Sequence, residues 1–164
     1  MRNFSHAGHN GEYRRFNINQ GIEDTLVIAK NEYKYSAKVE TDLGSLPDVR
    51  CFPEQLNQVF LNLIVNSTQA IETKHGAGKG EITVRTWQTE KHVCCEIADN
   101  GPGIAPEIQS RIFEPFFTTK DPGKGTGLGL SISYDIIVHK HKGELSVDCP
   151  ETGGTVFLIR IPTN

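Results

Sequence analysis

The chain lacks the features that would mark it as a membrane or nucleic-acid-binding protein. No apolar run approaches the roughly 18 residues that span a bilayer, and no signal peptide opens the sequence. The formal net charge is −3, so no basic excess indicates nucleic acid or an acidic membrane as the main partner. We expect a cytoplasmic domain, although a larger parent protein could be membrane-anchored.

Cysteine is scarce as well, with four residues and no CxxC pair. Cys94 and Cys95 are adjacent in a strand pattern, so their side chains should point to opposite faces. Metal or disulfide use is one interpretation of the cysteines. The other interpretation is that the cysteines are small buried residues in a reducing compartment, and the lack of a CxxC pair favours this one. The remaining two are Cys51 and Cys149.

The 164 residues suffice for one domain with a real core. Apolar periodicity predicts strands at 37–43, 49–52, 80–90, 91–99, 144–149 and 154–162, and helices around 22–29, over 53–72 and over 126–143. A short helical piece is expected at 106–114. Helices and strands interleave with hairpin-type connections. We therefore predict a two-layer α/β sandwich, with one mixed sheet and helices over one face.

The helix over 53–72 has an unusual polar face. Pro53 suits its first turn, and an apolar stripe runs along one side. Beside that stripe lies a row of uncharged amides at spacings of three and four: Gln55, Gln58, Asn62, Asn66 and Gln69. An outward helix face usually carries Lys and Glu, so the row fits a ligand-binding face as well as a solvated one.

Two further segments are rich in glycine. "DNGPGIAPE" follows a strand at Asp99, whose carboxylate could accept from an exocyclic amine such as that of adenine, or could be a turn residue. "GKGTGLGLS" precedes a helix, with Thr126 available as N-cap, and could cradle phosphates or be a flexible turn. It is not a P-loop. Asn66 offers a neutral oxygen to Mg²⁺.

The order and spacing of these segments resemble the ATP-binding catalytic domain of histidine protein kinases. "NQVFLNLIVNSTQAI", "DNGPGI", "RIFEPFFTTK" and "GTGLGLSIS" look like its asparagine-rich helix, first glycine motif, phenylalanine motif and second glycine motif. The same superfamily includes gyrase, heat-shock chaperone and mismatch-repair ATPases. The resemblance runs from about Phe16 to Pro162 and implies a Bergerat-type fold with a mainly antiparallel sheet and an ATP lid.

The resemblance also implies roles for individual residues. Asp99 would accept from the adenine amino group, Asn66 would coordinate Mg²⁺, and Asn62 would lie near the same ion or the γ-phosphate. Gly101 and Gly103 would let the chain pass close to the base, with Ile104 packed on the ring. The second glycine motif would cradle the phosphates through Gly125, Thr126, Gly127, Leu128, Gly129 and Leu130.

The lid would run from Gly101 to Gly125, with three hydrophobic anchors in Phe113, Phe116 and Phe117. Many histidine kinases place a basic residue three positions after the Mg²⁺ asparagine, where this chain has Gln69. Lys120 is therefore the candidate that neutralises the γ-phosphate, with a solvated lysine as the alternative.

In the related ATPases the position of Asn62 carries a glutamate that activates water. An amide cannot act as a general base, so Asn62 favours phosphoryl transfer over hydrolysis. Two alternatives remain open: an anti-sigma-type serine kinase, and a nucleotide-sensing module without catalysis.

The resemblance divides the chain into a tail at 1–15 and an ATP-binding catalytic domain at 16–164. "RNFSH" in the tail resembles the end of an upstream dimerisation domain, so we expect His6 not to be the phospho-acceptor. The implied partners are ATP, the dimerisation domain with its phospho-accepting histidine, and a response regulator receiver domain. We expect an isolated monomeric domain that binds no nucleic acid and is similar to nitrogen-regulation-like kinases.

Overall fold

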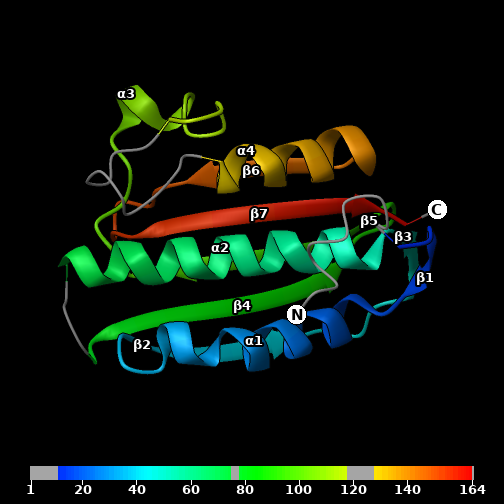
Figure 1. The fold of residues 1–164 in the computed structure, drawn as a ribbon, viewed down its shortest axis with the longest axis horizontal. Helices are drawn as coiled ribbons and strands as arrows, with labels where there is room; N and C mark the ends of the chain where they lie inside the picture. Colours follow the sequence, from blue (N-terminus) through cyan, green and yellow to red (C-terminus); the bar gives the residue numbers. More distant parts are fainter. Residues whose placement is uncertain (1–10, 75–77, 118–127, 164) are drawn as a thin grey trace.

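The fold consists of one sheet covered on one face by helices (Figure 1). The computed structural model describes residues 11–74, 78–117 and 128–163. The sheet contains, in spatial order, β2 (Ala37–Leu43), β4 (Gly80–Gln88), β5 (His92–Asp99), β7 (Thr155–Pro162) and β6 (Glu144–Asp148). β2 and β4 are parallel, and all other neighbours are antiparallel. The predicted sandwich with a mixed, mainly antiparallel sheet is therefore confirmed.

The second layer consists of α1 (Ile18–Tyr33), α2 (Pro53–Lys74) and α4 (Gly129–Tyr134), which continues as the π-helix η2 (Asp135–Lys140). α3 (Pro106–Gln109) is one short turn, smaller than the helical piece predicted at 106–114. Two short strands, β1 (Arg14–Phe16) and β3 (Val49–Cys51), pair apart from the main sheet. The domain boundary at residue 16 stays a prediction, and β1 begins two residues before it.

The core lies between the two layers. Alternation in β4 and β5 places Val84 opposite Ile97, and Ile97 opposite Phe157 of β7, so that one face of the sheet is apolar. The predicted apolar stripe of α2 packs on that face, and Leu56 and Leu63 are fully buried. Burial of each such side chain stabilises the fold by about 1.5–3 kcal/mol relative to exposure.

The four cysteines are free thiols. Cys51, Cys94 and Cys95 are buried, as expected for small residues in strands, and burial raises the pKa of Cys51 and of Cys95 to about 12. Cys149 differs because it is only partly buried and lies just after β6.

The C-terminal half of the helix predicted over 126–143 is wider than an α-helix. The structure changes from α-helix to π-helix at Asp135 and ends the helix at Lys140. At this end lies the buried His141, whose Nδ1 is 2.8 Å from the carbonyl oxygen of Ile136. Its Nε2 accepts the N–H of Phe52 at 3.0 Å, so the ring carries its proton on Nδ1. A side-chain donor at a helix end favours such a wide turn.

Protonation of His141 should destabilise the fold. Burial lowers the pKa of His141, so the neutral ring stabilises the fold fully above its ordinary pKa near 6.5, and this contribution declines below it. In His141→Leu the Phe52 N–H is left unpaired, which should cost about 1–3 kcal/mol at pH 7.5. The free energy of unfolding, measured with urea, should differ less between His141→Leu and wild type at pH 5.5 than at pH 7.5. His139→Gln changes an exposed histidine and should keep the wild-type dependence of the free energy of unfolding on pH. If His141→Leu keeps that dependence as well, His141 is not the group responsible.

Candidate functional site

Asp99 lies at the end of β5, on the face of the sheet that the helices cover. Its neighbours in register are Ile82 of β4 and Thr155 of β7, and the residue is only 8% exposed. Burial raises the pKa of this carboxyl, opposed by hydrogen bonds from the backbone N–H of Gly101 and of Thr155. The Gly101 N–H lies 2.8 Å from Oδ1. The carboxylate is thus held in a fixed orientation by backbone donors from two segments.

Ser67 of α2 adds a polar group beside this carboxylate that the sequence analysis did not single out. The residue is fully buried, and its Oγ has no partner at ordinary hydrogen-bond geometry. The hydroxyl is nevertheless near enough to help lower the Asp99 pKa. A buried hydroxyl without a full partner next to a carboxylate fits a site for a ligand edge that both donates and accepts hydrogen bonds.

Glycines allow three backbone segments to meet behind Asp99. Gly154 has a left-handed backbone with φ +82°, and a side chain there would collide with the carbonyl oxygen of Asp99. Gly103 has φ +81°, and a Cβ on it would lie 3.2 Å from the Gly154 carbonyl oxygen. The segment that leaves β5 therefore lies directly against the β6–β7 connection.

Ile104, the residue predicted to pack on the base, follows these glycines. It is partly buried against the core. Its N–H lies 3.3 Å from Sγ of Cys149, and its carbonyl oxygen accepts from Nε2 of Gln109 at 2.9 Å. Gly101, Gly103 and Ile104 are therefore brought together with Asp99 at one end of the sheet.

Asn62 connects α2 to the first turn of α4. Its Nδ2 lies 3.2 Å from the Gly129 carbonyl oxygen and 3.2 Å from Oγ of Ser133, while Oδ1 accepts from Nε2 of Gln58 at 2.8 Å. Ser133 is fully buried, and this contact was not foreseen from the sequence. Asn66 lies one turn further along α2 and is partly exposed, and its side chain makes no hydrogen bond to another described residue.

The second glycine motif is described from Leu128 onward. α4 begins at Gly129 with Leu128 as its N-cap residue, which makes no side-chain cap hydrogen bond. The N-cap position is thus taken by Leu128 and not by Thr126, the residue that the sequence offered for it. Leu128, Gly129 and Leu130 are partly buried, and the Gly129 carbonyl oxygen accepts from Asn62. Lys120, Gly125, Thr126 and Gly127 lie outside the described residues.

The three predicted anchors behave differently. Phe113 packs on Tyr134 of α4 with ring centroids 5.2 Å apart, and Phe117 lies under the Arg111 guanidinium at 4.7 Å. Phe116 is 71% exposed, so it is not an anchor. Its left-handed backbone, with φ 67°, sets it apart from its neighbours.

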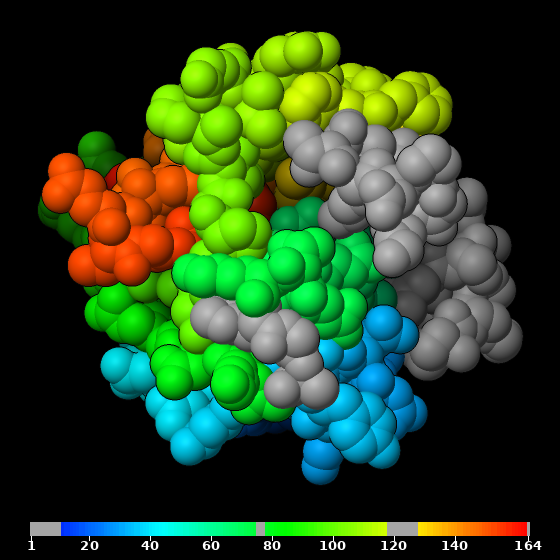
Figure 2. Space-filling model, turned by 90° about the vertical axis from the view of Figure 1, so that its left-hand side faces the viewer, coloured from blue at the N-terminus to red at the C-terminus, as the bar shows by residue number. Residues whose placement is uncertain are grey.

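Together these segments surround one hollow of the surface. Figure 2 shows the segment from residue 101 to 117 above it, the C-terminal half of α2 below it and α4 at its back. The elements that meet there carry the Asp99 carboxylate at the end of β5 and, along α2, the Ser67 hydroxyl and the amides of Asn62 and Asn66. That donor set fits a purine edge and a hydrated cation with phosphates.

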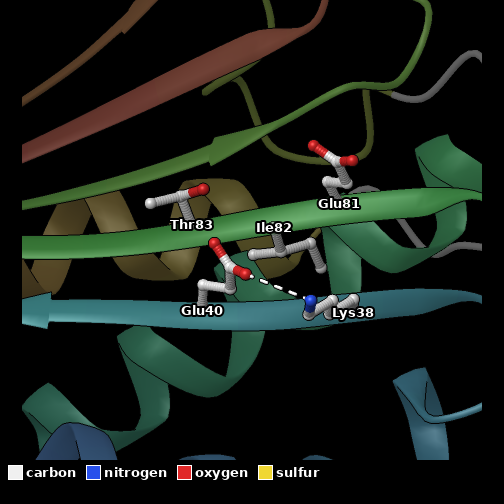
Figure 3. Close-up of a pocket in the computed structure, with 5 residues that line it drawn as sticks. All are labelled: Lys38, Glu40, Glu81, Ile82 and Thr83. Atoms are coloured by element: carbon white, nitrogen blue, oxygen red, sulfur yellow. Dashed lines mark ion pairs between the residues drawn. The ribbon is translucent and has the colours of Figure 1, made fainter.

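A second hollow, of about 90 Å³, lies on the face of β2 and β4 that the helices leave open (Figure 3). Its lining includes Glu40, Glu81 and Lys38, and the Nζ of Lys38 pairs with Oε2 of Glu40 at 3.3 Å. Two carboxylates would repel phosphates, and the hollow contains none of the predicted site residues. We therefore assign it no part in the site.

Among the described residues no helix is long and apolar enough to cross a membrane.

Comparison with known proteins agrees with this arrangement. Residues 52–164 match the family described as histidine kinase-, DNA gyrase B-, and HSP90-like ATPase. Sporulation kinase E of Bacillus subtilis is 36% identical over 92% of this chain and 20% of its own length. The signal transduction histidine-protein kinase AtoS of Escherichia coli is 34% identical over 98% of this chain and 26% of its own length. The chain thus spans about a fifth to a quarter of these relatives.

Solved structures extend the match to the fold. The catalytic domain of histidine kinase ThkA aligns with a TM-score of 0.81 and 30% identity, covering 93% of this chain and 99% of that one. ThkA in complex with the response regulator protein TrrA aligns with a TM-score of 0.75 and 30% identity, covering 92% of this chain and 41% of that one. The chain belongs to the histidine kinase-, DNA gyrase B-, and HSP90-like ATPase family, and within it to the catalytic ATP-binding domains of sensor histidine kinases.

Proposed function

We propose that this chain binds ATP with Mg²⁺ and transfers the γ-phosphoryl group to a histidine on a separate dimerisation domain, as part of a two-component kinase. The observation that carries the proposal is the buried Asp99 carboxylate at the end of β5, next to Ser67 of α2, together with Asn62 and Asn66 on the same helix and the hydrogen bond from Asn62 to the first turn of α4. The family match supports ATP as the nucleotide.

Asp99 and its surroundings recognise the base. The carboxylate accepts from the exocyclic amine of adenine, and the Ser67 hydroxyl supplies the polar group beside it. Gly101 leaves the space in front of the carboxylate free of a side chain, while Ile104 covers one face of the ring. Guanine presents a carbonyl where adenine presents the amine, so the same carboxylate would repel it.

The phosphates lie toward α4. Asn66 and the free lone pair of the Asn62 amide oxygen are the candidate Mg²⁺ ligands, since Mg²⁺ takes few protein oxygens beside phosphates. A bound Mg²⁺ neutralises phosphate charge. Gly129 and the motif residues outside the described part, Gly125, Thr126 and Gly127, complete the phosphate side on this proposal, with Lys120 neutralising the γ-phosphate.

The reaction is a transfer and not a hydrolysis. The acceptor histidine nitrogen attacks the γ-phosphorus, the bond to the bridging β-phosphate oxygen breaks, and ADP leaves with that oxygen. Asn62 cannot take a proton from water, because its Nδ2 donates to Gly129 and Ser133 and its Oδ1 is an amide oxygen. The likeness to ThkA, solved in complex with a response regulator, supports a receiver domain as the final acceptor.

Asp99→Asn should weaken ATP binding about tenfold or more, because a hydrogen bond to a charged acceptor is lost. The amide can donate to the guanine carbonyl, so the preference for ATP over GTP should also shrink. Competition against a fluorescent ATP analogue measures both. Asp148→Asn, an exposed aspartate at the end of β6, is the matched control. If Asp99→Asn keeps the wild-type affinity for ATP and the wild-type preference for ATP over GTP, Asp99 is not the acceptor of the adenine amine.

Asn66→Ala should uncouple Mg²⁺ from nucleotide binding. Wild type should bind ATP severalfold more tightly with Mg²⁺ than with EDTA, and the variant should show less than about a twofold difference. Calorimetric titration with and without the metal gives the ratio, and Asn31→Ala on exposed α1 surface controls for loss of an amide. A full Mg²⁺ effect in Asn66→Ala would assign the ion to other residues.

Transfer itself can be separated from hydrolysis with ATP labelled at the γ-phosphate. The chain is mixed with a purified dimerisation domain that bears the acceptor histidine, and free phosphate and acid-labile protein label are counted together. We expect label on the acceptor and little free phosphate. Free phosphate released at the same rate without acceptor would establish hydrolysis and contradict the role given to Asn62.

A further inference from the structure

The backbone of Ile104 is held at both ends by side chains from other segments. Its N–H donates to Sγ of Cys149 at 3.3 Å, and its carbonyl oxygen accepts from Nε2 of Gln109 at 2.9 Å. The two holding residues come from different places, the end of β6 and the end of α3. Ile104 is therefore fixed between the sheet and the segment that overhangs the hollow.

Cys149 also faces Thr155, the first residue of β7. Its Sγ lies 4.0 Å from Oγ1 of Thr155, at the outer limit for a thiol hydrogen bond. Thr155 is 4% exposed and lies opposite Asp99 in register, and its backbone N–H is one of the donors that lower the Asp99 pKa. The same short stretch of chain thus contacts the proposed base acceptor on one side and Ile104 on the other.

Gly103 and Gly154 constrain the two backbone segments that meet at the contact between Cys149 and Ile104. The left-handed backbone of Gly103 turns the chain immediately before Ile104, and a Cβ there would lie 4.0 Å from the Cβ of Cys149. Gly154, at the other end of the β6–β7 connection, leaves room for the Asp99 carbonyl. Because both backbones are tightly constrained, a side-chain acceptor at 149 meets the Ile104 N–H without rearrangement.

We propose that Cys149 is a positioning residue for nucleotide binding: its sulfur fixes the Ile104 backbone, so that Ile104 is in place before the base arrives. This inference rests on the proposed function. Cys51, Cys94 and Cys95 instead lie within strands. Ordering a segment in advance removes part of the entropy cost of binding, so loss of the contact weakens affinity without removing any group that touches ATP.

Cys149→Ala should weaken ATP binding about two- to fivefold, the effect of one weak hydrogen bond. In the absence of nucleotide, the Ile104 amide should exchange its hydrogen faster by a similar factor, as measured by NMR. Cys149→Ser should restore both values to near wild type, because a hydroxyl oxygen also accepts from the N–H. Thr152→Ala, an exposed residue of the same connection, removes one polar atom and should change neither.

Gln109→Ala provides a second test from the opposite end of Ile104 and should weaken ATP binding in the same direction. The proposal is overturned if Cys149→Ala keeps wild-type affinity, if affinity falls while Ile104 exchange stays unchanged, or if Cys149→Ser is as weak as Cys149→Ala. Wild-type protein that binds no ATP would instead refute the proposed function. Exchange at Ile104 would still report whether the sulfur holds the backbone.

Discussion

The architecture of the site depends on the burial of one carboxylate. Asp99 is removed from water at the end of a central strand, and a buried carboxylate is costly unless donors surround it. The donors come from the backbone of Gly101 and Thr155, and both require those segments to lie close to the carboxylate. Burial raises the pKa of Asp99, and the hydrogen bonds it accepts act in the opposite direction. On the proposed function the adenine amine supplies one further donor to this carboxylate.

The same requirement explains the glycines around the strand end. Donors can reach the carboxylate only if the chain after β5 folds back against the β6–β7 connection, and Gly103 and Gly154 supply the left-handed turns and the space. Cys149 then closes the contact with Ile104. Packing at this end of the sheet and the direction of the following segment are thus tied to a single buried carboxylate.

The sequence predicted the strands and helices that follow from local hydrophobic periodicity. The strands β4 and β5 and the helix α2 with Pro53 in its first turn agree with the structure. It did not predict features that depend on distant contacts: the π-helix held by His141 and Phe52, the exposed ring of Phe116, or the contact of Cys149 with Ile104. Partners for these groups lie tens of residues away, beyond the reach of pattern or propensity.

Asn62 shows that fold and chemistry constrain the same position. A glutamate there would have no N–H to donate to the Gly129 carbonyl oxygen, and its negative charge would face that oxygen. The junction of α2 and α4 would then lose a hydrogen bond worth about 0.5–1.5 kcal/mol and gain a repulsion. On the proposed function the same amide also favours transfer over hydrolysis, because it cannot act as a general base. One side chain would then serve both the joining of the two helices and the choice of reaction.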